Sequence, residues 1–157
     1  MKLLEIRNLV VRYGVIEALH GINIDVEQGA MVALLGANGA GKSTILKAVS
    51  GLVKPASGST IMLNGANVAG KRAHAVSKMG LSLSPEGRQI FTGLTVEENL
   101  LAGAYGLKRH TQLIEDEHGI KRKVSISVKA QLKENFDRVY KLFPVLAERK
   151  KQQASTL

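Results

Sequence analysis

The chain lacks cysteine altogether, which excludes disulfide bonds and thiolate metal sites and is typical of the reducing cytoplasm. It has no run approaching eighteen uninterrupted apolar residues, so we expect no membrane-spanning helix. Charged residues appear at once in Met1-Lys2-Leu3-Leu4-Glu5, which argues against the apolar core of a secretory signal. The sequence therefore predicts a protein that stays in the cytoplasm.

Aromatic residues are scarce at 4%, whereas the formal net charge is +9. Such a charge attracts nucleotide phosphates, nucleic acid or anionic lipid head groups. The basic residues are spread along the chain, with modest clusters at Lys121-Arg122-Lys123 and Arg149-Lys150-Lys151. Because no aromatic residues alternate with these clusters, base stacking has little support, and we favour a solvated basic face over a nucleic-acid site.

The remaining composition is that of a globular protein. A length of 157 residues allows one domain, or part of one, with a sizeable core. Apolar residues form 45% of the chain and charged residues 22%, so a disordered chain is excluded. Four histidines show no metal-ligand spacing and are assigned structural or surface roles: His20, His74, His110 and His118.

The sequence is organised around residues 36–44, Gly-Ala-Asn-Gly-Ala-Gly-Lys-Ser-Thr. Two of the glycines bracket four residues and are followed by lysine and serine, which is the spacing of a phosphate-binding P-loop. The apolar run 31–35 before it predicts a buried strand, and residues 45–50 predict a helix that begins near Lys42. Glycines let successive N–H groups point to one centre, where the helix N-terminus also favours an anion. A plain glycine turn is the alternative, but the strand–loop–helix order favours phosphate binding.

Two predicted strands, Leu3–Val11 and Ile22–Val26, precede this core and indicate an antiparallel layer beside it. Tyr13 falls at the tip of this pair, where its ring could stack on a flat ligand. Taken alone, an edge residue of the sheet is the simpler interpretation of Tyr13.

Further elements follow the loop. We expect a strand at 60–63, a tight turn at Asn64-Gly65, a short helix over 71–79 and a strand at 80–83 that leads into a loop at 84–88. Ligands of open α/β folds bind at such loops.

The sequence predicts that the last part of the chain is mainly helical. Thr95 and Glu98 form a capping box, so a helix begins at Val96. Residues 107–128 lose all clear periodicity and are interpreted as a surface excursion, and a helix then runs from Val128 to Phe143, ended by Pro144. Residues 148–157 are polar and basic, without a cap or closing strand.

Taken together, these pieces resemble the ATP-binding subunit of ABC transporters, most closely the form found in branched-chain amino-acid importers. The likeness is carried by Tyr13, residues 36–44, Ser57-Gly58, Asn64-Gly65, residues 85–91 (Pro-Glu-Gly-Arg-Gln-Ile-Phe), residues 94–100 (Leu-Thr-Val-Glu-Glu-Asn-Leu) and Leu142-Phe143-Pro144. It covers nearly the whole chain except 107–128, which looks like an insertion. The resemblance implies an α/β fold, in which a P-loop core sheet is joined by an antiparallel β layer and a helical subdomain.

The resemblance also implies ATP and Mg²⁺ as cofactors. Tyr13 would stack on adenine, and the backbone N–H groups of Asn38–Lys42 would hold the β-phosphate. Lys42 would neutralise the β and γ oxygens, the Ser43 hydroxyl would ligate Mg²⁺, and Thr44 would contact the α-phosphate. The implied nucleotide-binding set is Tyr13, Gly36, Asn38, Gly39, Ala40, Gly41, Lys42, Ser43, Thr44 and Glu86, with Ser43 as the metal ligand.

Two departures from the family pattern matter. Glu86 stands where most of the superfamily has Gln, in the loop that senses the γ-phosphate and contacts the membrane subunit, and its carboxylate changes the charge near the metal. Leu157 falls at the first position of the Leu-Ser-Gly-Gly signature, so the second Mg²⁺ ligand, the catalytic base and the γ-phosphate histidine are not in this sequence. We therefore expect a partial nucleotide-binding domain, incomplete at the C-terminus, whose 157 residues alone do not hydrolyse ATP.

Residues 1–95 are assigned to the P-loop core with its β layer, and residues 96–157 to the helical subdomain. The implied partners are the permease subunits of an importer and a second ATPase subunit, at the cytoplasmic face of the membrane. The expected role is to couple ATP hydrolysis to the uptake of branched-chain or related amino acids. The alternative is a fragment that binds nucleotide without hydrolysing it.

Overall fold

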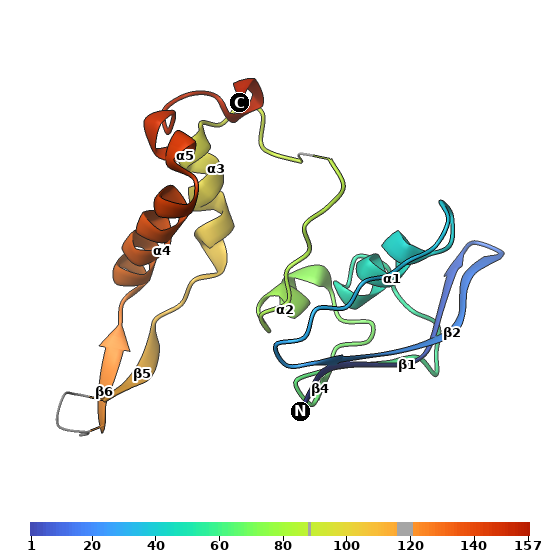
Figure 1. Ribbon diagram of the computed structural model, residues 1–157. Helices are drawn as coiled ribbons and strands as arrows, with labels where there is room; N and C mark the ends of the chain where they lie inside the picture. The colour runs from blue at the N-terminus through green and yellow to red at the C-terminus, as the bar shows by residue number, and fades with distance from the viewer. Residues whose placement is uncertain (88, 116–120) are drawn as a thin grey trace. The chain divides into compact units, whose positions relative to one another are not determined.

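The computed structural model describes residues 1–87, 89–115 and 121–157 (Figure 1). The chain folds as two compact units, Met1–Ser84 and Pro85–Leu157. The sequence analysis placed its division after residue 95, whereas residues 85–95 fold with the second unit. Hydrogen bonds to Asn99 and to the C-terminal segment hold part of this stretch on the first helix of that unit.

The first unit contains the elements β1 (Lys2–Tyr13), β2 (Ile16–Glu27), α1 (Lys42–Val49), β3 (Thr60–Leu63), β4 (Ala66–Asn67) and α2 (Ala73–Ser77). The second contains α3 (Val96–Gly103), η1 (Ala104–Gly106), β5 (His110–Glu115), β6 (Lys121–Ile126), α4 (Val128–Leu142), α5 (Pro144–Glu148) and η2 (Ala154–Thr156).

An antiparallel sheet in the order β2-β1-β3-β4 forms the frame of the first unit. The early strands and the strand at 60–63 are therefore confirmed. Asn64 and Gly65 join β3 to β4 with φ angles of 46° and 76°, as the tight-turn prediction requires. One sheet face packs against α1 to make the core, whose most buried side chains are Ile6, Leu9, Val11, Ile61, Val68 and Val76.

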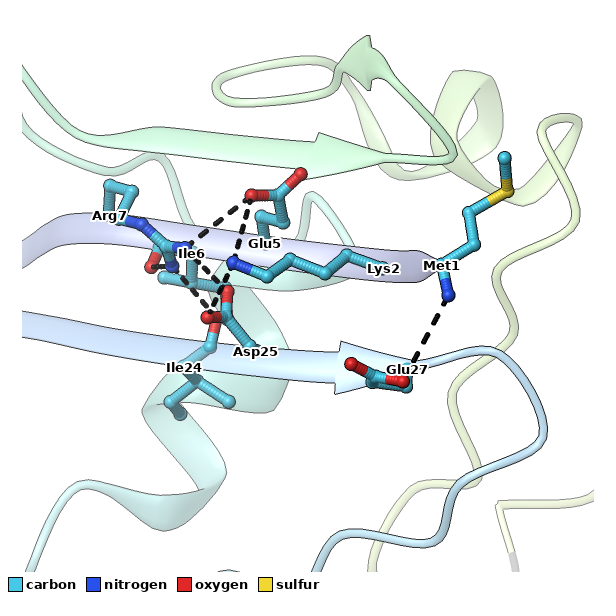
Figure 2. Close-up of polar contacts among 8 residues, drawn as sticks. All are labelled: Met1, Lys2, Glu5, Ile6, Arg7, Ile24, Asp25 and Glu27. Carbon is cyan, nitrogen blue, oxygen red and sulfur yellow. Dashed lines mark hydrogen bonds and ion pairs between the residues drawn. The ribbon is translucent and has the colours of Figure 1, made fainter.

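An ion-pair network covers part of the exposed face of β1 and β2 (Figure 2). The Asp25 carboxylate lies 2.6 Å from the Arg7 guanidinium and 3.0 Å from the Lys2 ammonium. Glu5 lies 3.4 Å from Arg7 and 3.7 Å from Lys2, so two cations alternate with two anions. The Lys2 and Arg7 hydrogen bonds lower the pKa of Asp25 below its ordinary value.

Two predicted strands, at 31–35 and 80–83, are wrong in this structure. Neither segment has a strand partner within Met1–Ser84, and a strand needs a hydrogen-bonded neighbour to form. The side chains of Met31 and Leu35 are 99% and 92% exposed, whereas Leu34 and Leu81 pack against the core. The apolar character of the two runs is thus only partly satisfied by burial.

Helices α3 and α4 of the second unit begin at the predicted residues. The Thr95 hydroxyl accepts the Glu98 N–H at 3.2 Å, and the Glu98 carboxylate accepts the Thr95 N–H at 2.8 Å, which completes the capping box. Helix α4 begins at Val128 and ends at Leu142, and Pro144 then occupies the first turn of α5 rather than only ending a helix.

Two parts of the second unit were not foreseen. The expected surface excursion contains the antiparallel hairpin β5–β6, which the mixed polar pattern had hidden. The C-terminal segment was expected to lack a closing strand, but Thr95 and Gln153 form an antiparallel bridge, and the Ala154 N–H donates to the Leu94 carbonyl at 3.0 Å. Ala154 is 5% exposed, so a small buried side chain anchors this polar, basic stretch together with the backbone hydrogen bonds.

Candidate phosphate-binding site

The glycine-rich loop lies directly before α1, in the first unit. Gly41 is the N-cap residue of α1, and both Gly39 and Gly41 have positive φ angles, 84° and 88°. The Ala40 N–H donates to the Ala37 carbonyl at 3.2 Å, which closes the turn. Glycine adopts this left-handed backbone without steric cost, so the predicted loop and the predicted start of the helix are both confirmed.

The Lys42 side chain folds back over this loop. Its ammonium donates to the carbonyl oxygens of Gly36, at 2.6 Å, and Ala37, at 2.7 Å. A lysine at the first position of a helix therefore lies against the loop that precedes it, and its charge adds to the positive end of the helix dipole. The loop and the helix together concentrate positive charge at one place.

The antiparallel sheet supports the loop from one side. A Cβ atom on Gly41 would come within 2.6 Å of the Leu19 Cδ2 atom and 3.3 Å of the Ala18 carbonyl oxygen. Leu19 lies in β2 and is 2% exposed. The sheet thus requires glycine at position 41 for close packing as well as for its φ angle. The sequence analysis missed this role of Leu19, because the predicted strand began only at Ile22 and left Leu19 outside it.

Tyr13 ends β1 and is 47% exposed, opposite Ile16 at the hairpin tip. Close by, the Glu17 carboxylate lies 2.7 Å from the Arg12 guanidinium and 2.9 Å from His20 Nδ1. The hydrogen bonds from Arg12 and then from His20 lower the pKa of Glu17. The exposed ring is available for contact with a flat ligand, and that role stays a prediction.

The other predicted residues fall into two groups. Ser43 and Thr44 lie in the first turn of α1, beside Lys42. Glu86 belongs to the second unit, where its carbonyl oxygen accepts a hydrogen bond from Gln89 Nε2 at 3.3 Å. Arg88 of the loop motif and His118 lie outside the described residues.

The described residues also bear on metal binding and on membrane insertion. Among the described residues, no three His, Cys, Asp or Glu side chains gather where they could hold a metal ion. The longest helix, α4, has 15 residues, and none of the described helices has the length and apolarity needed to cross a bilayer.

Comparison with known families shows which family the chain belongs to. The sequence model of the ABC transporter family matches residues 19–156, which include the whole glycine-rich loop and α1. The chain belongs to the ABC transporter family. The predicted family is therefore confirmed.

Among the curated relatives are ATP-binding proteins of amino-acid transport. The high-affinity branched-chain amino acid transport ATP-binding protein BraG of Pseudomonas aeruginosa is 37% identical over 145 residues, 92% of this chain and 53% of that protein. The probable branched-chain amino acid transport ATP-binding protein LivF of Archaeoglobus fulgidus is 30% identical over 92% of this chain and 52% of its own length. The chain thus spans about half the length of these relatives.

Solved structures agree on the fold. The ADP conformation of MJ1267, an ATP-binding cassette of an ABC transporter, matches with a TM-score of 0.72 at 22% identity, over all of this chain and 59% of that one. An ATP-binding subunit of an ABC transporter matches with a TM-score of 0.56 at 34% identity, over 66% of this chain and 42% of its own. The predicted α/β class, with its antiparallel layer and helical part, is confirmed.

Proposed function

We propose that this chain carries the ATP-binding loop of an ABC importer. The observation that carries the proposal is the fold of residues 36–44, a glycine turn at the N-terminus of α1 with the Lys42 ammonium lying over it. Backbone N–H groups and a lysine beside a helix N-terminus supply donors and positive charge, which suits a polyphosphate. The donor set therefore fits a nucleotide.

The individual roles follow the family pattern. The N–H groups of Asn38–Lys42 hold the β-phosphate, and Lys42 neutralises the β and γ oxygens. Ser43 supplies one hydroxyl oxygen to Mg²⁺, which prefers oxygen ligands, and Thr44 contacts the α-phosphate. Tyr13 stacks on the adenine ring. When bound, Mg²⁺ offsets the charge of the phosphate oxygens.

Unlike the other proposed nucleotide-binding residues, Glu86 lies in the second unit of the chain. Its loop belongs to the second unit, the part of the chain that we propose faces a permease subunit. A carboxylate repels phosphate oxygens unless a cation lies between them. Glu86 stays in the proposed nucleotide-binding set, in which its carboxylate changes the charge near the metal, and Ser43 remains the proposed metal ligand.

We further propose that the complete transporter couples ATP hydrolysis to the import of branched-chain or related amino acids. The support comes from the relatives named for that transport, of which BraG shares 37% identity over 92% of this chain. The partners are permease subunits and a second ATPase subunit, and the chain works at the cytoplasmic face of the membrane as a peripheral protein. The functional division into a P-loop core, residues 1–95, and a helical subdomain, residues 96–157, is part of the same proposal, although residues 85–95 fold with the second compact unit.

Binding of Mg-ATP tests the first proposal. The chain is titrated with Mg-ATP by calorimetry beside Lys42→Ala and a control, Lys47→Ala, which removes an exposed lysine from the same helix. Loss of binding in Lys42→Ala alone supports the proposal, and equal affinity in all three proteins refutes it. Phosphate release by the same samples separates hydrolysis from the alternative, binding without hydrolysis.

A further inference from the structure

The side-chain amide of Asn99, in α3, holds a single loop residue from both sides. Its Oδ1 accepts the Phe91 N–H at 2.9 Å, and its Nδ2 donates to the Phe91 carbonyl at 3.1 Å. The same Nδ2 lies 2.9 Å from the Thr95 carbonyl and 3.3 Å from the Leu94 carbonyl. One amide thus binds both backbone polar groups of Phe91 and two further carbonyls before α3.

Phe91 contributes to the wall of an open apolar pocket in the second unit. The pocket has a volume of about 750 Å³, and its apolar lining includes Leu100, Leu146 and Leu157. The Phe91 side chain is 63% exposed, so packing alone fixes its position weakly. The backbone bonds to Asn99, together with the Leu94 N–H that donates to the Phe91 carbonyl at 3.0 Å, therefore restrain the main chain that carries this ring.

The capping of α3 does not depend on Asn99. Thr95 and Glu98 cap the helix through their own reciprocal hydrogen bonds. Phe91 lies outside the helix, and helix geometry by itself does not require a bond to it. Two hydrogen bonds of the Asn99 amide thus go to Phe91 in the loop, and two go to the carbonyls of Leu94 and Thr95 at the start of the helix.

We propose that Asn99 is a positioning residue, whose amide fixes the Phe91 main chain and so sets the place of its ring in the pocket wall. The role rests on the proposed function, because the second unit is the part that we assign to permease contact. The structure assigns Asn99 this task through four hydrogen bonds of one side chain. A flexible Phe91 would lose part of its contact energy to ordering on binding.

The chain has no tryptophan, so Phe91→Trp introduces a single fluorescent reporter at this position. The reporter chain is compared with versions that also carry Asn99→Ala, Asn99→Asp or Thr95→Ala. We expect Asn99→Ala to lower the anisotropy and to raise acrylamide quenching about twofold, because the restraint is removed. Asn99→Asp keeps an acceptor for the N–H of residue 91 but lacks the donors, so its anisotropy and quenching should lie between those of the reporter chain and of Asn99→Ala. Thr95→Ala weakens the helix cap alone and leaves the signal unchanged.

Hydrogen exchange gives a second measurement in the unaltered Phe91 background. The Phe91 amide is expected to exchange about tenfold faster in Asn99→Ala, since one hydrogen bond of about 1.4 kcal/mol corresponds to a factor of ten. Unchanged exchange and quenching, or an equal change in Thr95→Ala, would overturn the proposal. Neither readout involves nucleotide, so failure of Mg-ATP binding refutes the proposed function without altering this result.

Discussion

Gly41 and Leu19 approach so closely that a Cβ atom at position 41 would lie 2.6 Å from the Leu19 Cδ2 atom. The contact joins the N-terminus of α1 to β2, so the antiparallel sheet holds the glycine-rich loop in place. Because the loop packs on the sheet at this contact, its shape depends on a side chain of β2.

The pair Gly41 and Gly39 tests this relationship. Both have positive φ angles, 88° and 84°, but a Cβ on Gly39 meets nothing within 4 Å. Gly39→Ala is expected to cost about 1–2 kcal/mol for the left-handed backbone alone. Gly41→Ala should cost about 1–3 kcal/mol more, because Leu19 must also move. Urea unfolding of the two variants gives the comparison, and equal losses would show that the sheet does not constrain the loop.

The ion-pair network on β1 and β2 predicts a pH dependence of stability. Lys2 and Arg7 lower the pKa of Asp25 in the folded chain, so its contribution is present above its unfolded pKa, about 3.9. The contribution is lost as the pH falls through the lower, folded pKa. The urea midpoint, measured between neutral pH and pH 3, should fall less steeply in Asp25→Asn than in the parent chain. Lys2→Met should also reduce the fall of the urea midpoint with pH. In the double variant Lys2→Met/Asp25→Asn the reduction should be no larger than in Asp25→Asn alone, and full additivity of the two effects would contradict the ion pair.

The capping box of α3 makes a separate prediction. Thr95→Ala removes the hydroxyl that accepts the Glu98 N–H and should lower stability by about 1 kcal/mol. The Thr95 N–H and hydroxyl also lower the pKa of Glu98, so this stabilisation is present above the unfolded pKa of Glu98 and fades as the pH drops through the folded one. Thermal unfolding at neutral and acidic pH measures both the loss of stability in Thr95→Ala and its dependence on pH. A loss in Thr95→Ala that is as large at acidic as at neutral pH would contradict the role of the carboxylate.

Local patterns predicted most of the first unit. The alternation of Ile22 to Val26, the Asn64-Gly65 turn and the glycine spacing of 36–44 each specify a structure within a few residues, and each formed as expected. The apolar runs 31–35 and 80–83 failed as strands, because strand formation depends on a neighbour that local pattern does not reveal.

The second unit was harder to predict for the same reason. The pairing of β5 with β6 and the bridge between Thr95 and Gln153 join segments whose own sequences are polar and irregular. Of the candidate site, the residues of the loop and of α1 were found by motif. Leu19 acts through packing between segments far apart in the sequence, which a motif does not contain. Asn99 belongs to the motif at 94–100, but the motif does not reveal that its amide binds the Phe91 backbone.

The affinity of the chain for Mg-ATP, with and without Lys42, tests the central claim most directly. The Lys42 ammonium lies 2.6 Å from the Gly36 carbonyl oxygen, over the loop that we propose holds the phosphates. Calorimetric titration should show binding by the parent chain and by Lys47→Ala, and affinity about tenfold lower or weaker still for Lys42→Ala, which lacks the charge that pairs with phosphate. Binding of equal strength in Lys42→Ala, or none in the parent chain, would contradict the account.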